Sequence, residues 1–203
     1  MTPQQTTEAS QAAYAALRQS LNQYATISDD TWKAFRPLCR YRELSARALL
    51  YSVGQHPDSF SYVFTGLFRV FISDAQGNEY NKNFFAEGSF PGCMTALLTG
   101  EPSQFSVQAL EPVQIIEIDF NGYRALLDSN IELMRFQIRY LEQHWLQAKD
   151  TREVEIVQQG ASQRYRSFLR QYPDLHRRLA QYHIASHLGI TPTQLSRIRR
   201  NIL

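Results

Sequence analysis

The stretch Gln181-Tyr-His-Ile-Ala-Ser-His-Leu-Gly-Ile-Thr-Pro-Thr-Gln-Leu-Ser-Arg-Ile198 is the most informative part of this 203-residue chain. Gly189 can take the left-handed backbone conformation that ends one helix and lets another begin within a few residues. Thr191 is placed to cap the second helix, Pro192 suits its first position, and Gln194 can close a capping box. Apolar residues recur at the spacing of two crossed helices: Ile184, Ala185, Leu188, Ile190, Leu195 and Ile198. The pattern predicts a helix-turn-helix.

The outward faces of the second helix carry residue types that read DNA. Arg can pair with guanine through two hydrogen bonds, Gln with adenine, and Ser or Thr with base edges or phosphates. We expect Thr191, Thr193, Gln194, Ser196 and Arg197 to contact DNA, with Arg199 and Arg200 on phosphates. The alternative is an ordinary helical hairpin with a solvated basic face.

The distribution of charge favours DNA binding. Residues 151–203 hold nine arginines against three acidic residues, a net charge of +6, whereas residues 1–150 hold twelve Lys and Arg against sixteen acidic residues, a net charge of −4. Arginine suits phosphate contact because its charge is fixed and its donor fork is planar. The candidates in this region are Arg164, Arg166, Arg170, Arg177, Arg178, Arg197, Arg199 and Arg200. Some of these side chains are expected to make internal contacts instead.

The composition indicates a globular chain with 43% hydrophobic and 20% charged residues. No apolar run is long enough to span a bilayer, and the polar N-terminus lacks the features of a secretory signal, so we expect a cytoplasmic protein that makes no contact with membranes. Cys39 and Cys93 are far apart and are expected to be core residues rather than metal ligands. His183 and His187 have helical metal-ligand spacing, but no carboxylate nearby completes a site. We therefore predict no metal and no cofactor.

Residues 44–120 are punctuated by glycines and prolines at short intervals, which predicts short strands joined by turns and closed into a sandwich or barrel. The run 62–72 is rich in aromatic and β-branched residues, and 81–85 is expected to return as its partner strand. The segments 106–110 and 113–118 are expected to pair with each other. An enzyme of the cupin type is an alternative, but His56 is the only histidine in residues 44–120.

A long helix is predicted after Asn130. Its apolar residues alternate spacings of four and three, which is typical of a coiled-coil seam and favours pairing with a second copy of the chain. The seam consists of Met134, Ile138, Leu141, Trp145 and Ala148. The alternative is an amphipathic helix lying across its own barrel.

In this order of elements the chain resembles the Crp/Fnr family of bacterial transcription regulators over nearly its whole length. The segment 183–200 resembles the DNA-reading segment of the family, whose Ser-Arg pair is matched by Ser196 and Arg197, and 62–70 resembles a hairpin of cyclic-nucleotide-binding domains. The resemblance implies an α+β fold with N-terminal helices and a jelly-roll (double-stranded β-helix) sensor barrel over 1–128. A dimerisation helix would span 129–157 and a helix-turn-helix domain 158–203.

The effector pocket departs from the family pattern. Cyclic-nucleotide-binding members have an acid for the ribose and an Arg-Ser or Arg-Thr for the phosphate, whereas Cys93 replaces the acid here and Ser103-Gln104 replaces the Arg-Ser pair. A cyclic nucleotide whose phosphate is buried without its arginine would lose roughly 1.5–3 kcal/mol of binding free energy. We therefore expect no response to cyclic AMP, and a pocket that is empty, filled by side chains or adapted to another small-molecule effector. The candidate pocket residues are Gly88, Ser89, Phe90, Gly92, Cys93, Ser103 and Gln104.

The predicted function is that of a homodimeric regulator that binds double-stranded DNA and is not an enzyme. Two copies would read half-sites one helical turn apart. Activation would require a surface that contacts RNA polymerase, and the sequence does not locate one. A ligand-sensing module that binds another protein, without DNA binding, remains the alternative because fold does not assign function.

Overall fold

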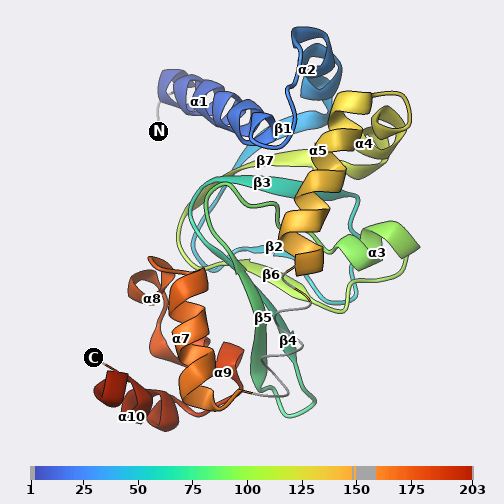
Figure 1. Ribbon diagram of the computed structural model, residues 1–203. Helices are drawn as coiled ribbons and strands as arrows, with labels where there is room; N and C mark the ends of the chain where they lie inside the picture. The colour runs from blue at the N-terminus through green and yellow to red at the C-terminus, as the bar shows by residue number, and fades with distance from the viewer. Residues whose placement is uncertain (1–2, 148, 150–158, 203) are drawn as a thin grey trace. The chain divides into compact units, whose positions relative to one another are not determined.

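The computed structural model describes residues 3–147, 149 and 159–202 (Figure 1). Two compact units divide the chain: Met1–Val70 with Phe84–Leu141, and Phe71–Asn83 with Glu142–Leu203. The boundary between the two units falls within the two strands of one β-hairpin. The tip of this hairpin, Phe71–Asn83, therefore belongs to the same unit as the C-terminal helices. That hairpin lies within residues 1–128, the region expected from the sequence to form the barrel.

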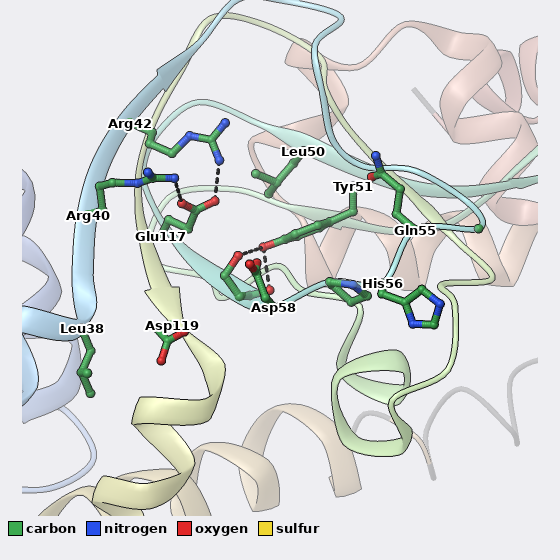
Figure 2. Close-up of a pocket in the computed structure, with 13 residues that line it drawn as sticks. Leu38, Arg40, Arg42, Leu50, Tyr51, Gln55, His56, Asp58, Glu117 and Asp119 are labelled. Atoms are coloured by element: carbon green, nitrogen blue, oxygen red, sulfur yellow. Dashed lines mark hydrogen bonds and ion pairs between the residues drawn. The ribbon is translucent and has the colours of Figure 1, made fainter.

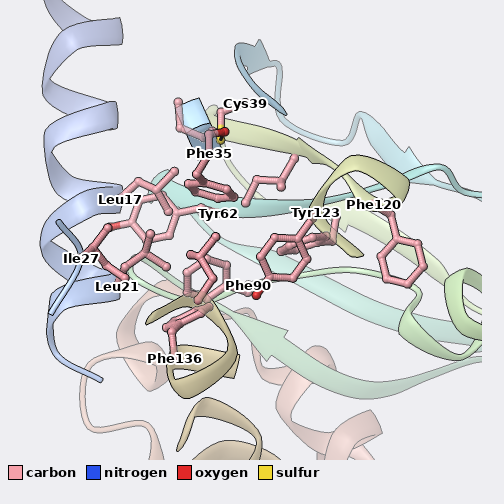
Figure 3. Close-up of a cluster of buried hydrophobic side chains, with 14 of the residues drawn as sticks. Leu17, Leu21, Ile27, Phe35, Cys39, Tyr62, Phe90, Phe120, Tyr123 and Phe136 are labelled. Carbon is pink, nitrogen blue, oxygen red and sulfur yellow. Dashed lines mark hydrogen bonds between the residues drawn. The ribbon is translucent and has the colours of Figure 1, made fainter. Parts of the chain in front are cut away.

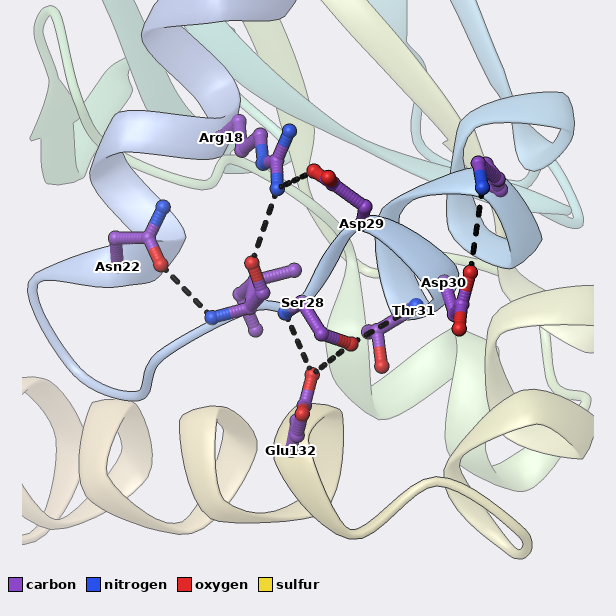
Figure 4. A network of polar contacts seen from close by, with 9 residues as sticks. Arg18, Asn22, Ser28, Asp29, Asp30, Thr31 and Glu132 are labelled. Atoms are coloured by element: carbon purple, nitrogen blue, oxygen red, sulfur yellow. Dashed lines mark hydrogen bonds and ion pairs between the residues drawn. The ribbon is translucent and has the colours of Figure 1, made fainter.

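The first unit begins with helices α1 (Pro3–Asn22) and α2 (Asp29–Phe35), followed by the 3-10 turn η1 (Arg36–Leu38). Ser28 caps α2, because its Oγ accepts a hydrogen bond from the Thr31 N–H at 3.2 Å. Figure 4 shows that Glu132 accepts from both the Ser28 N–H and the Ser28 hydroxyl. These bonds lower the pKa of the Glu132 carboxyl and hold the cap of α2 against the helix that carries Glu132.

Seven strands among the described residues form two antiparallel sheets of three and four strands, ordered β1-β7-β3 and β2-β6-β4-β5. They are β1 (Cys39–Leu44), β2 (Leu49–Tyr51), β3 (Ser59–Thr65), β4 (Phe68–Ser73), β5 (Glu79–Phe85), β6 (Ser106–Ala109) and β7 (Val113–Asp119). The predicted α+β fold with a jelly-roll barrel is confirmed.

Two details of the predicted strands were wrong. The segments 106–110 and 113–118 do not pair with each other: β6 pairs with β2 and β4, and β7 pairs with β1 and β3. Pro112 lies between β6 and β7, where the chain passes from one sheet to the other. The run 62–72 is also two strands rather than one, because Gly66 turns the chain with a φ of +104°.

The three-stranded sheet has an apolar cluster on each of its two faces, an outer one against the helices and an inner one against the four-stranded sheet. The outer cluster joins α1, α2, α4 and α5 to strands β1, β3 and β7, and Figure 3 shows Leu17, Phe35 and Tyr123 among its members. The inner cluster lies between the sheets. It consists of Tyr51, Val63, Phe68, Val70, Cys93, Ala96, Val107, Ala109, Val113 and Ile115. Both cysteines are free and buried, as expected.

Short helices complete the first unit: α3 (Met94–Thr99), α4 (Phe120–Leu127) and α5 (Ile131–Leu141). The Asp119 carboxylate caps α4 by accepting from the Gly122 N–H at 2.6 Å. The long helix predicted over 129–157 begins as α5 and continues into a π-helical turn, η2 (Glu142–Leu146). Residues 150–157 of that prediction lie outside the described residues.

The C-terminal helices belong to the second unit. They are α7 (Ala161–Gln171), α8 (Leu175–Arg178), α9 (Gln181–Leu188) and α10 (Pro192–Ile202). Helix α7 ends before Pro173, as a proline at that position predicts.

Candidate DNA-binding helix and barrel sites

Helices α9 and α10 form the predicted helix-turn-helix. Helix α9 ends at Gly189, whose φ of +64° is the left-handed conformation expected there. The Thr191 Oγ1 accepts from the Gln194 N–H at 3.1 Å, while Gln194 Oε1 accepts from the Thr191 N–H at 2.9 Å. The capping box is therefore formed, and it sets the direction in which α10 leaves the turn.

Four of the six apolar positions of the motif, Ile184, Ala185, Leu188 and Leu195, are buried, and Ile190 and Ile198 are half-buried. Ile184 is 1% exposed and Leu195 is fully buried. Ala185 is also fully buried, which suits a small residue at a helix crossing. Helix α10 is thus held by one side, and its opposite side faces solvent.

The exposed side of α10 carries the candidate DNA-reading residues. The exposed side chains are Thr191, Thr193, Gln194, Ser196, Arg197 and Arg200, and Arg199 is half-buried. Gln194 uses its oxygen in the capping box, which leaves its amide NH2 group to donate to DNA. The structure brings these residues together on one helix, and their contact with DNA stays a prediction.

The other arginines of this unit differ in their surroundings. Arg164 on α7 donates to the Leu188 carbonyl at 3.0 Å and to the Gln159 carbonyl at 2.8 Å. It therefore satisfies the C-terminal end of α9, where a cation is favourable, instead of being free for phosphate. Arg166 and Arg177 are exposed.

The candidate effector segment runs beside β3. The Gly88 N–H donates to the Val63 carbonyl at 2.9 Å, and the Val63 N–H donates to the Ser89 carbonyl at 3.0 Å. Phe90 is 7% exposed and packs into the outer cluster, where its ring lies 5.2 Å from that of Tyr140. Gly92 has no room for a Cβ, which would lie 2.8 Å from that of Phe60.

Cys93 and Ser103 meet at one carbonyl. The Cys93 thiol contacts the Phe105 oxygen at 3.9 Å, and the Ser103 hydroxyl donates to the same oxygen at 2.8 Å. Cys93 packs in the inner cluster and Ser103 is 3% exposed, whereas Gln104 is exposed. The two positions at which the family pattern has an acid and an arginine are thus occupied by small buried side chains.

A cavity that the sequence analysis did not predict lies at the inner face of β1 and β7 (Figure 2). It has a volume of about 780 Å³. Arg40 and Arg42 both form ion pairs with the Glu117 carboxylate, and the Arg40 guanidinium nitrogen lies 2.5 Å from Glu117 Oε2. The cavity is lined by Leu38, Arg40, Arg42, Leu50, Tyr51, Gly54, Gln55, His56, Pro57, Asp58, Ser59, Glu117 and Asp119.

Register explains why these charges face inward. Arg42 lies opposite Ile115, which belongs to the inner cluster, and Arg40 lies opposite Glu117. Tyr51 donates to the Ser59 carbonyl at 2.8 Å, and burial raises the pKa of Tyr51 to about 12. The only sequence signal was the alternation of Arg40 and Arg42, which is equally typical of a solvated strand face.

Helix α5 has one buried and one exposed apolar face. Leu133 and Phe136 pack in the outer cluster. Met134, Ile138 and Leu141 are 37%, 50% and 38% exposed. Trp145, in η2, is 47% exposed, and Ala148 lies outside the described residues. Helix α5 does lie across its own barrel, as the alternative expects, but it packs there through Leu133 and Phe136. The seam residues Met134, Ile138 and Leu141 stay exposed, and their pairing with a second copy stays a prediction.

These features define a jelly-roll barrel with N-terminal helices, joined along the chain to a helix-turn-helix. Residues 41–130 match the family model of the cyclic nucleotide-binding domain. The cAMP-activated global transcriptional regulator CRP of Pasteurella multocida is 23% identical over 106 residues, which are 52% of this chain and 51% of that protein. The chain thus spans about half the length of the curated relatives it matches.

Solved structures of regulators share the fold. FixK2 from Bradyrhizobium japonicum has a TM-score of 0.66 at 15% identity, covering 81% of this chain and 84% of that one. The c-di-GMP responsive global regulator CLP of Xanthomonas campestris has a TM-score of 0.66 at 13% identity, and the match covers 86% of this chain and 91% of that one. The resemblance of this chain to Crp/Fnr regulators is confirmed at the level of the fold.

Two absences concern only the residues that the structure describes. None of their helices has the length and apolar character needed to cross a membrane. Among the same residues, no three His, Cys, Asp or Glu side chains gather where they could hold a metal ion.

Proposed function

We propose that this chain is a homodimeric transcription regulator of the Crp/Fnr type that binds specific double-stranded DNA. The observation that carries the proposal is the capped helix α10, which buries Leu195 and exposes Thr193, Ser196 and Arg197 on its other side. Such a helix fits the major groove, where Arg reads guanine and Ser or Thr reads base edges.

Dimerisation is proposed through α5. Its exposed apolar side chains would be removed from water by the same face of a second copy, in the two-fold arrangement that such a seam favours. The dimer would present two copies of α10 about 34 Å apart, so that each reads one half-site of a pseudo-palindrome.

Selection of bound fragments from genomic or random DNA tests sequence-specific binding first. On a selected fragment, we expect Arg197→Ala to lower affinity by about 1–3 kcal/mol and to relax base preference at one position in each half-site. The reason is the loss of a bidentate pair with a base. A binding titration and a repeated selection with the variant measure both effects.

Arg166→Ala is the matched control, because Arg166 is exposed on α7 in the same unit and its loss removes the same charge. It should leave base preference unchanged. If the wild-type chain binds selected and random duplex equally, or not at all, the proposal fails and the ligand-sensing interaction module becomes the better interpretation.

We also propose that cyclic AMP is not the effector. The acid and the arginine of the family pattern are replaced by Cys93 and Ser103, and Cys93 packs among apolar side chains that offer no charge to a phosphate. Titration calorimetry should detect no binding of cyclic AMP below millimolar concentration, and the nucleotide should not change DNA affinity. Micromolar binding would contradict this proposal without affecting the one on DNA.

A further inference from the structure

Strand β5 is an edge strand, so one of its sides has no neighbouring strand in the sheet order β2-β6-β4-β5. Edge strands expose backbone N–H and C=O groups, which must be paired with other groups or with water. Its residues Glu79–Asn83 belong to the second unit together with α7 to α10. The groups that pair with the β5 edge inside this unit can therefore stabilise the helix-turn-helix.

Side chains of α9 pair with the edge in place of a strand. The Ser186 hydroxyl donates to the Glu79 carbonyl at 2.8 Å and accepts from the Asn81 N–H at 2.9 Å. The His187 Nδ1 lies 3.2 Å from the Asn81 carbonyl, and it must donate because a carbonyl can only accept. Three backbone groups of the edge are thus satisfied by two residues of the first motif helix.

The Asn81 side chain reinforces the contact. It is 4% exposed, and its amide nitrogen donates to the His183 carbonyl at 3.1 Å and lies 3.2 Å from His183 Nδ1. Because that nitrogen donates, His183 Nδ1 accepts, which places the proton of the neutral ring on Nε2. The Tyr172 hydroxyl, just beyond α7, donates to Asn83 Oδ1 at 2.8 Å.

These contacts engage the polar face of α9 formed by His183, Ser186 and His187, while Ile184 and Leu188 face the other helices. The apolar core of the C-terminal helices is small. Its buried members among the described residues are Tyr165, Phe168, Leu175, Leu179, Ile184, Ala185, Leu188 and Leu195. A core of this size gives limited stability, so the hydrogen-bonded hairpin is expected to contribute substantially.

We propose that the hairpin tip Phe71–Asn83 is an integral part of the DNA-binding module and that its contact with α9 controls the order of α9 and α10. Strand β4 begins in the first unit and β5 ends there, so the two strands provide a covalent route by which a change in the barrel reaches the hairpin tip and α9. The effect on DNA affinity rests on the proposed function, whereas the effect on the order of the helices does not.

The test compares Ser186→Ala with Ser162→Ala in the full-length chain. Ser162 is exposed on α7 and is a serine of the same unit that no hydrogen bond ties to the hairpin. Ser186→Ala removes the hydroxyl that pairs with both the Glu79 carbonyl and the Asn81 N–H. We expect amide hydrogen exchange in α9 and α10 to become about tenfold faster, with exchange in β1, β3 and β7 unchanged. Affinity for a selected DNA fragment should fall at least severalfold.

Tyr172→Phe gives a second measurement if Ser186→Ala folds poorly, because it removes one hydroxyl and keeps the ring. It should accelerate exchange in the same helices by a smaller factor. Equal exchange in Ser186→Ala and Ser162→Ala, or acceleration spread evenly over the barrel strands, would overturn the proposal. If the wild-type chain binds no DNA, the proposed function fails, and hydrogen exchange still decides whether the hairpin orders α9 and α10.

Discussion

Gly66 joins β3 to β4 where no other residue fits. Its φ is +104°, and a Cβ would lie 2.4 Å from Val113 Cγ1 and 2.9 Å from the Pro112 carbonyl oxygen. The Gly66 N–H donates to the Glu87 carboxylate at 2.8 Å. The turn is therefore constrained both by its backbone conformation and by the approach of the neighbouring chain.

Gly66→Ala is expected to lower the free energy of unfolding of the barrel by on the order of 3 kcal/mol or more, because two of the contacted atoms are backbone and cannot move aside. Gly54→Ala is the matched control. Gly54 has a φ of +83° with nothing within 4 Å of the added Cβ, so only strain of about 1 kcal/mol applies. Urea unfolding measures both, and equal losses would show that the close approach to Val113 is unimportant.

Helix α5 presents one apolar face to solvent while its other face holds the outer cluster. Ile138 lies in the middle of the exposed face, and a charge there would be buried without a partner in the proposed dimer. The helix itself should tolerate glutamate at this position, because glutamate is a good helix former. The two effects can therefore be separated.

Ile138→Glu is expected to convert the dimer to a monomer, measured by analytical ultracentrifugation, with unchanged helix content by circular dichroism. Leu98→Glu, at a leucine on α3 that is 62% exposed, is the control and should leave the dimer intact. A stable dimer of Ile138→Glu would place the interface elsewhere on the chain.

The whole chain has a net charge of only +2, so its attraction to DNA depends on where the arginines lie. Arg200 is exposed at the end of α10, and we assign it to phosphate. Each phosphate contact releases counterions, which makes affinity fall as salt concentration rises.

Arg200→Ala should remove one phosphate contact from each copy, or two from the dimer. The slope of log affinity against log salt concentration should therefore become shallower by about 1.8, with the preferred sequence unchanged. Titrations at several salt concentrations measure the slope. An unchanged slope, or an altered preferred sequence, would contradict the assignment of Arg200 to phosphate.

The sequence was sufficient where the physical causes are local. The capping box joins Thr191 to Gln194, three residues apart, and the conformation of Gly189 follows from the lack of a side chain. The burial of Leu195 follows from helical spacing. For these reasons the helix-turn-helix and its capping box could be predicted. The spacing of glycines and prolines predicted only a sandwich or barrel, and the jelly-roll followed from the resemblance to Crp/Fnr regulators.

Contacts between residues that are far apart in the sequence could be seen only in the tertiary structure. Arg40 meets Glu117 across 77 positions, and Asn81 meets Ser186 across 105. Each of these residues is compatible with a solvated surface when it is considered alone, and strand partners are set by packing between sheets, which local patterns do not record. The partners of β6 and β7, the charged cavity and the binding of α9 to the β5 edge therefore became visible only once the sheets and helices were packed together.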